Sequence, residues 1–250
     1  MQTSIVKRAL GVIAMALVPT LASAAPFTFS WSSGTRAASV TFDTSGTNLV
    51  VTLTNTSTFD AMNPTDILTA VFFDVAGSPT LTPLSAALGS GSTVFFGPNG
   101  GGNVGGEWAY GSGLSGAPGG AATGISSAGF GLFGSANFGG ANLQGPTAVN
   151  GIGYGITSAG DNSATGNAAV TGQFALIQNS VVFTLSGLPG GFDPSTAISN
   201  VVFQYGTSLS EPNSKVPEPA TVMLLGPAAL GLLIARRRVC RRKGSEKASS

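Results

Sequence analysis

The sequence predicts an all-β fold, an antiparallel β-sandwich or jelly roll with Gly-rich loops, flanked by an N-terminal signal helix and a C-terminal transmembrane helix. Three observations lead to this prediction. Short stretches alternate apolar and polar residues, turn residues separate these stretches, and no long amphipathic helical pattern occurs between two terminal apolar segments. The chain has 250 residues, which gives room for one β domain with its own core, expected over residues 25–206.

The first strands are expected near the start of this domain. Apolar and polar residues alternate over 27–31, 38–43 and 48–57. The run 66–75 is almost continuously apolar, which is typical of a strand buried on both faces. The residues around Gly46 separate two of these stretches and predict a tight turn, because glycine adopts the positive φ that such turns require.

The middle of the domain, residues 97–160, differs in composition. It holds more than half of the chain's 37 glycines and one charged residue, Glu107. We expect long, partly irregular loops and a few strands here, because aromatic and aliphatic residues remain frequent enough to form a core. Trp108 and Tyr110 are expected on the same face of a short strand.

The strand pattern returns towards the end of the domain. Residues 172–188 predict two strands joined by a turn, and 200–206 predict another strand. Between them, Asp193 and Pro194 predict the start of a short helical turn, since Asp caps a helix and Pro suits its first position. Residues 207–215 are expected to form a polar linker.

Residues 1–24 have the three parts of a secretory signal peptide. Two basic residues are followed by an apolar run, 9–17, that is too short to span a bilayer. Ala22 and Ala24 then form the small-x-small pattern that signal peptidase accepts, and cleavage is expected after Ala24.

An uncharged run of sixteen residues, Ala220 to Ala235, lies near the other end of the chain. As a helix it would span about 24 Å, somewhat less than the hydrocarbon core of about 30 Å. We expect a transient anchor in the inner membrane that leaves the body, defined here as residues 25–215, outside the cytoplasm. The arginines that would retain the far end in the cytoplasm are Arg236, Arg237 and Arg238.

Val216, Pro217, Glu218 and Pro219, followed by this apolar run and the arginine cluster, resemble the PEP-CTERM sorting signal over residues 216–243. The resemblance implies an exported protein of a Gram-negative bacterium. It implies that exosortase, a membrane-embedded cysteine protease-transpeptidase, recognises and removes the tail, and that the body reaches the cell surface or the extracellular matrix. The same tail is sometimes labelled an ice-binding protein C-terminal domain, a label that implies no ice binding here.

The residues of the box suit this role physically. Proline fixes φ, so the two prolines keep the segment extended and rigid beside the membrane, as a protease cleft requires. Glu218 adds a charge that an enzyme can recognise. Residues 244–250, beyond the signal, are expected to be a disordered tail.

Charge and composition exclude several classes of function. The body holds two basic and eight acidic side chains, a net charge of −6, which gives no electrostatic footprint for nucleic acid. The chain has no His and a single Cys, Cys240. Neither a Ser-His-Asp nor a Cys-His catalytic arrangement nor a Cys/His metal site can therefore form, and no cofactor is expected.

The main hypothesis is a non-enzymatic surface or matrix protein, structural or associated with the exopolysaccharide of a biofilm. Signal peptidase and exosortase are its expected processing enzymes. The alternative is a carbohydrate-binding or carbohydrate-active β-sandwich protein. In that case Trp108 and Tyr110 are the expected ligand contacts, with Glu107 nearby, since an exposed aromatic face can stack on a sugar ring.

Two other uses of the acidic residues stay open on the sequence alone. The loops 59–66 and 160–167 each supply oxygen ligands of the kind that Ca²⁺ prefers, although neither matches an EF-hand. Turns in which Asp accepts backbone hydrogen bonds are the favoured interpretation of both loops. A glycosidase-like carboxylate pair could come only from Asp60, Asp66, Asp74 and Glu107.

Overall fold

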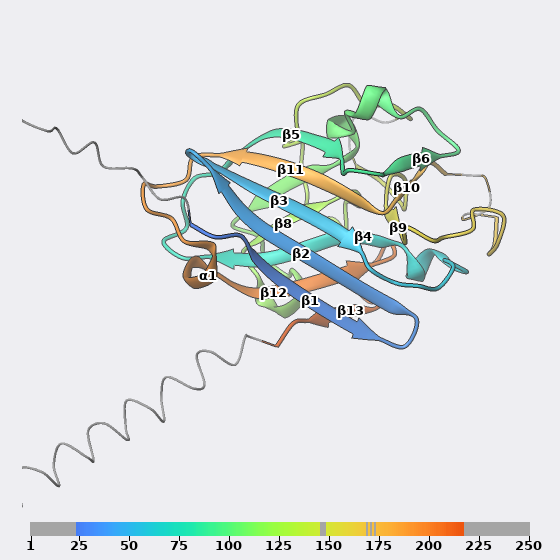
Figure 1. Cartoon of the computed structure of the whole chain (residues 1–250), viewed down its shortest axis with the longest axis horizontal. Helices are drawn as coiled ribbons and strands as arrows, with labels where there is room; N and C mark the ends of the chain where they lie inside the picture. The colour runs from blue at the N-terminus through green and yellow to red at the C-terminus, as the bar shows by residue number, and fades with distance from the viewer. Residues whose placement is uncertain (1–23, 146–148, 169, 171, 173, 218–250) are drawn as a thin grey trace, which may run out of the picture.

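The computed structural model describes residues 24–145, 149–168, 170, 172 and 174–217. This part of the chain forms a mostly β protein with two mostly antiparallel sheets and few helical turns (Figure 1). The expected signal helix and membrane helix lie outside the described residues. Among the residues that are described, no helix is long and apolar enough to cross a membrane.

The first sheet has five antiparallel strands. β1, β2 and β3 form a meander, and Gly46 has a φ of 61° in the turn between β2 and β3, as predicted. β11 comes from far along the chain and pairs with both β3 and β5. The spatial order is β1 (Phe27–Ser33), β2 (Arg36–Ser45), β3 (Asn48–Asn55), β11 (Ser180–Ser186) and β5 (Thr82–Leu88).

The second sheet has eight strands. The pair β9/β10 is parallel, whereas the other pairs in this sheet are antiparallel. Its main path runs β13 (Asn213–Lys215), β12 (Ile198–Tyr205), β4 (Leu68–Val75), β9 (Ile156–Thr157), β10 (Leu176–Gln178) and β6 (Thr93–Phe95). β4 pairs with β8 (Thr123–Ser126) as well as with β9, and β8 pairs in turn with β7 (Ala109–Ser112).

Helical structure in the described residues is limited to single turns. The predicted turn after Asp193 is confirmed as α1 (Pro194–Ala197), where the Asp193 carboxylate accepts a hydrogen bond from the Ser195 N–H at 2.9 Å. The 3-10 turns are η1 (Pro64–Asp66), η2 (Gly100–Gly102), η3 (Gly105–Glu107) and η4 (Pro118–Gly120).

The two sheets share one hydrophobic core. Phe42 on β2 and Phe73 on β4 come from different sheets, and their ring centroids lie 4.9 Å apart. Trp108, which precedes β7, contacts Phe183 of β11 with the same centroid distance. Alternating residues on one face of β3, Leu49, Val51 and Leu53, are fully buried in this core, as their alternation predicted, whereas Phe27 and Trp31 on β1 are partly buried.

β4 is buried on both faces, as its continuous apolar sequence predicted. Phe73 faces the main core, while Phe72 packs on the opposite side against Val202 and small residues of the Gly-rich region, Ala117 and Ala121. Gly124 is required in this arrangement, because a Cβ there would lie 2.6 Å from the Phe72 ring. The Gly-rich region therefore covers the outer face of the second sheet.

The segment 207–215, expected to be a polar linker, is instead part of the folded body. β13 pairs with β12, and Val216 continues this pairing by donating its N–H to the Val201 carbonyl at 2.8 Å. The sequence pattern fails here because β13 is a three-residue strand at the sheet edge, too short and too polar to show alternation.

Replacing Phe73 with Ala is expected to lower the free energy of unfolding by about 3–5 kcal/mol, because it leaves a cavity at the contact between the two sheets. Chemical denaturation of both proteins measures this change. Phe59→Ala serves as the control, since this ring is 55% exposed, and is expected to change stability by less than about 0.5 kcal/mol. Equal effects of the two variants would contradict a core centred on Phe73.

Candidate functional site

Trp108 and Tyr110 lie on the same side of their segment, as predicted, but that side faces the core. Trp108 is fully buried and Tyr110 is 4% exposed, and both belong to the main hydrophobic cluster. Trp108 is therefore not available to stack on a sugar, which corrects the expectation of a ligand contact there, whereas Tyr110 lines a cavity of about 390 Å³ together with Asp74. The reason is that β7 pairs with β8 in the second sheet, so its apolar face is turned towards the first sheet.

Glu107 has a structural role in this arrangement. Its carboxylate accepts hydrogen bonds from the backbone N–H groups of Leu143 and Gln144 and so ties η3 to a loop more than thirty residues later. Burial raises the pKa of this carboxyl, and the two N–H donors oppose that shift. Burial, with a smaller effect of the Glu107 charge, also raises the pKa of Tyr154 to about 12.

Asp74 is likewise engaged with its own fold. Its carboxylate accepts hydrogen bonds from the Ala122 N–H at 2.7 Å and from the Asn200 side-chain amide at 2.9 Å. These contacts attach the Gly-rich region and β12 to the end of β4. Each of the two carboxylates, on Glu107 and on Asp74, therefore closes a different loop.

The two loops that resembled partial Ca²⁺ sites are brought together, although they lie about a hundred residues apart. Asp161 accepts a hydrogen bond from the Ala61 N–H at 2.7 Å. Asp60 accepts in return from the Asn162 N–H at 3.1 Å and the Thr165 hydroxyl at 3.2 Å. We call this reciprocal contact the Asp60–Asp161 staple.

The hydrogen-bond donors to the two carboxylates of the staple are backbone N–H groups and a hydroxyl. Burial raises the pKa of Asp161, against the lowering effects of the Ala61 N–H and the Thr157 hydroxyl. Among the residues that the structure describes, no group of three or more His, Cys, Asp or Glu side chains could hold a metal ion. The staple fits the interpretation of both loops as Asp-capped turns.

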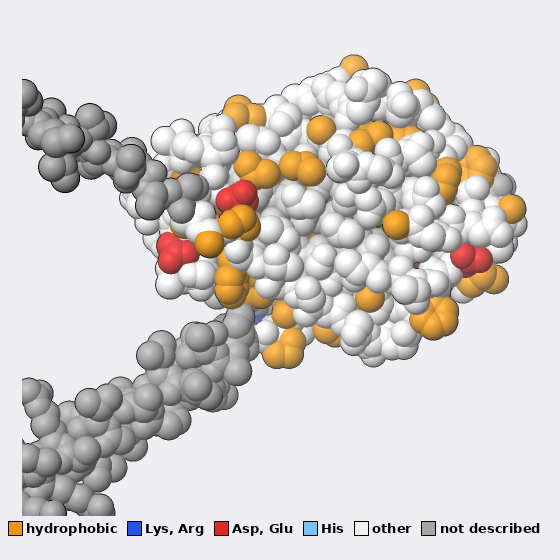
Figure 2. Space-filling model, viewed as in Figure 1, with side chains coloured by type: hydrophobic (Ala, Val, Ile, Leu, Met, Phe, Trp, Pro, Cys, Tyr) orange, Lys and Arg blue, Asp and Glu red, His pale blue; other side chains and the backbone are white. Residues whose placement is uncertain are grey.

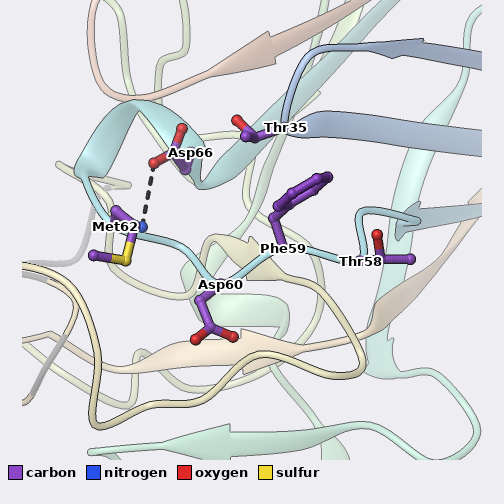
Figure 3. A pocket seen from close by; sticks show the side chains of 6 residues that line it. All are labelled: Thr35, Thr58, Phe59, Asp60, Met62 and Asp66. Atoms are coloured by element: carbon purple, nitrogen blue, oxygen red, sulfur yellow. Dashed lines mark hydrogen bonds between the residues drawn. The ribbon is translucent and has the colours of Figure 1, made fainter.

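Beside this staple, an open cavity of about 430 Å³ lies at the end of the loop after β3 (Figure 3). Two apolar side chains on its wall are unusually exposed, Phe59 at 55% and Met62 at 51%. In Figure 3 the Phe59 ring and the Asp60 carboxylate point to opposite sides of the loop. The lining residues are Thr35, Thr58, Phe59, Asp60, Met62 and Asp66.

An ion pair holds the wall of this cavity. Arg36 and Asp66 are 2.9 Å apart, and the Arg36 Nε donates to the Thr65 carbonyl at 2.8 Å. Asp66 also accepts hydrogen bonds from the Met62 and Asn63 N–H groups, the first of which is drawn in Figure 3. The loop is thereby fixed with Phe59 turned outward. In the sequence, the signal for this cavity is the presence of two large apolar residues, Phe59 and Met62, in a turn-rich stretch that has no strand alternation.

The outer face of the first sheet carries aligned hydroxyl groups. Thr28, Thr41 and Thr52 lie side by side on β1, β2 and β3, and the hydroxyls of the first two are 2.7 Å apart. A second row follows two residues away. Strand geometry spaces such rows by about 4.8 Å across the sheet and about 6.8 Å along it. The second row consists of Ser30, Ser39 and Thr54.

Charged side chains are sparse on the surface of the body. Figure 2 shows a face that is mostly neutral, with small separate acidic spots and scattered apolar side chains. The body's two basic residues are Arg36, which is paired with Asp66, and Lys215 at the end of β13. This surface offers neutral hydrogen-bonding groups to a partner far more than it offers charge.

Of the predicted sorting motif, the structure describes only Val216 and Pro217. Val216 is 5% exposed and belongs to the main core, whereas Pro217 is exposed. At the other end of the chain, Ala24 lies at the first described position. The remaining residues of the two signals, Ala22, Glu218, Pro219, Arg236, Arg237 and Arg238, lie outside the described residues.

Comparisons with protein-family models, with curated proteins and with solved structures found no match. The functional argument therefore depends on the residues of this chain.

Replacing Glu107 with Gln is expected to remove one pH-dependent contribution to stability. Because burial raises the pKa of Glu107 above its ordinary value of about 4.5, the folded protein keeps this proton at a pH where the unfolded chain has lost it. The contribution is complete below that value and is lost as the pH rises through the raised pKa. Urea unfolding of wild type and E107Q from pH 4 to pH 8 measures it.

In this comparison the stability of wild type relative to E107Q should fall as the pH rises. A difference between the two proteins that stays constant over the range would contradict the assignment.

Proposed function

We propose that this chain is an exported protein that exosortase sorts to the cell surface or the extracellular matrix. Its body is a β-sandwich with a non-enzymatic role, structural or in association with exopolysaccharide. The observation that carries the proposal is the order of three elements at the C-terminal end. A Pro-Glu-Pro box comes first, then the uncharged run Ala220 to Ala235, then a cluster of arginines.

Each element has a physical task in this proposal. The uncharged run holds the exported chain transiently in the inner membrane, and Arg236 to Arg238 keep its far end in the cytoplasm. The box then stands extended at the outer surface of that membrane, where exosortase cuts the chain. Signal peptidase removes residues 1–24 at the other end, so both terminal segments act only during delivery.

Properties of the body support a role in a hydrated polymer matrix. Its outer surface is mostly neutral, and two rows of Ser and Thr hydroxyls lie in register on the first sheet. Such hydroxyls exchange hydrogen bonds with the hydroxyl groups of a polysaccharide without a large cost of desolvating charge. The Gly-rich region packs on the outer side of β4 and β12 and so shields apolar side chains such as Phe72 and Val202 from water.

Replacing Pro217, Glu218 and Pro219 together with alanine is expected to leave the protein in the inner-membrane fraction at its unprocessed size. The reason is that the extended box, the substrate of the processing enzyme, is lost while the membrane segment remains. Immunoblots of cell fractions measure size and location. Pro189→Ala is the control, since it removes an exposed loop proline outside the signal. Normal processing and surface display of the triple variant would contradict the sorting proposal.

A second candidate function is carbohydrate binding at the cavity that follows β3. This proposal depends on the residues that line the cavity, which do not include Trp108 or Tyr110. One observation favours it: Phe59 presents an exposed ring at a cavity that Asp60 and Asp66 also line. An aromatic face stacks on a pyranose ring, and carboxylates accept hydrogen bonds from sugar hydroxyls. Both carboxylates are engaged in the fold, which argues for binding in preference to catalysis.

Under this second function, Phe59→Ala is expected to weaken binding of the mature protein to its best glycan about tenfold or more, through loss of ring stacking. A glycan array followed by titration calorimetry measures the affinity. Phe174→Ala is the matched control, because Phe174 is also exposed, at 41%, but does not line the cavity. Equal affinity of wild type and F59A would exclude the cavity as the binding site.

A further inference from the structure

The backbone pairing of the body extends to Val216, the first residue of the proposed sorting signal, with no spacer between the two. β13 forms backbone pairs with β12 that place Asn213 opposite Gln204 and Lys215 opposite Val202. Val216 adds one more hydrogen bond, from its N–H to the Val201 carbonyl at 2.8 Å, and buries its side chain in the main core. Pro217 is the next residue and is exposed.

The turn before β13 is held by two polar side chains. Gln204 is fully buried, and its Nε2 donates towards the carbonyls of Tyr205 at 2.8 Å and Ser208 at 3.1 Å. The Glu211 carboxylate accepts hydrogen bonds from the N–H groups of Thr207 and Ser208. These contacts set the direction in which the chain returns along β12.

Gly206 adopts a backbone conformation in this turn that favours glycine. Its φ is 74°, and a Cβ at this position would lie 2.3 Å from a carboxylate oxygen of Glu211. The Gly206 N–H donates to the Ile67 carbonyl at 2.9 Å, which ties the turn to the start of β4. β13 is therefore a fixed edge strand and not a loose extension.

A protease binds several residues on each side of the bond it cuts as an extended segment, with free backbone groups. The bonds up to Val216 do not meet this requirement while the body is folded, because their backbone pairs with β12 and the Val216 side chain is in the core. Cleavage there would require β13 to detach first, at the cost of its hydrogen bonds and of burying Val216.

We propose that the processing enzyme cuts at a bond C-terminal to Pro217, so that Val216 stays with the body as its last core residue and Pro217 stays with it. This inference rests on the proposed sorting function. The cut breaks one peptide C–N bond. The acyl carbon of the body forms a new bond to water or to an acceptor amine, which gives up a proton, and the tail leaves with that proton on its new amino terminus.

The first test is the mass of the mature protein isolated from its own cells. A C-terminal residue at Pro217 or later supports the inference, and added mass at that end identifies an amine acceptor. A C-terminal residue at Val216 or earlier overturns the inference alone. A protein that keeps its complete tail in the cell overturns the proposed function and this inference together.

The second test does not depend on exosortase. Lys215 and Arg36 are the body's two basic residues, so trypsin can cut the body after only these positions. We expect the Lys215–Val216 bond of the folded exported chain to be cut at least about a hundredfold more slowly than in urea-unfolded chain. Equal rates would overturn the inference, because β13 would then not protect this bond.

Gly206→Ala is expected to speed trypsin cleavage after Lys215 about tenfold or more, since the new Cβ would displace the Glu211 carboxylate from the Thr207 and Ser208 N–H groups. Gly191→Ala is the matched control. Gly191 has a φ of 73°, and a Cβ there meets nothing within 4 Å, so it shares the backbone strain without the collision. Cleavage after Arg36 reports global unfolding. Equal acceleration by both variants would contradict the role of the 206–211 turn.

Discussion

Contact between the inner faces of the two sheets is the constraint on which the rest of this structure depends. Phe42 and Phe73 meet across it, and Trp108 meets Phe183 at a second point. Apolar area removed from water there contributes roughly 25 cal/mol per Å². The chain has no disulfide and, in its described part, one ion pair, so this core and backbone pairing hold the body together. The alternation of apolar and polar residues along the strands and the inward direction of Trp108 both follow from this contact between the sheets.

The strands of this core could be predicted because burial on one face leaves a period of two in the sequence, as in β2 and β3. β4 could be predicted because burial on both faces leaves a continuous apolar run. β5 and β13 could not. β5 contains Pro83 and small residues, and β13 is three polar residues long, so neither has a pattern that distinguishes it from a loop.

The candidate sites show a similar division. The two Asp-containing loops were identified from their residues, but their reciprocal contact depends on chain segments about a hundred residues apart and has no local signature. Trp108 and Tyr110 were placed on one face, yet local sequence does not say whether that face meets solvent or a second sheet. The proposed sorting signal is different in kind, because a linear motif consists of consecutive residues and is read from the sequence without any tertiary contact.

The order in which strands pair has a consequence for when the protein can fold. β11 pairs with β3, and β12 pairs with β4, in each case across more than a hundred residues of chain. Proteins dominated by such distant pairings fold slowly, because the entropy of closing a long loop is lost before the contacts form. If the chain is exported as proposed, neither sheet can be completed until residues 180–216 have left the export channel. Under that proposal the body stays unfolded through most of its passage across the membrane, and it folds only when the proposed membrane segment behind it is about to enter the bilayer.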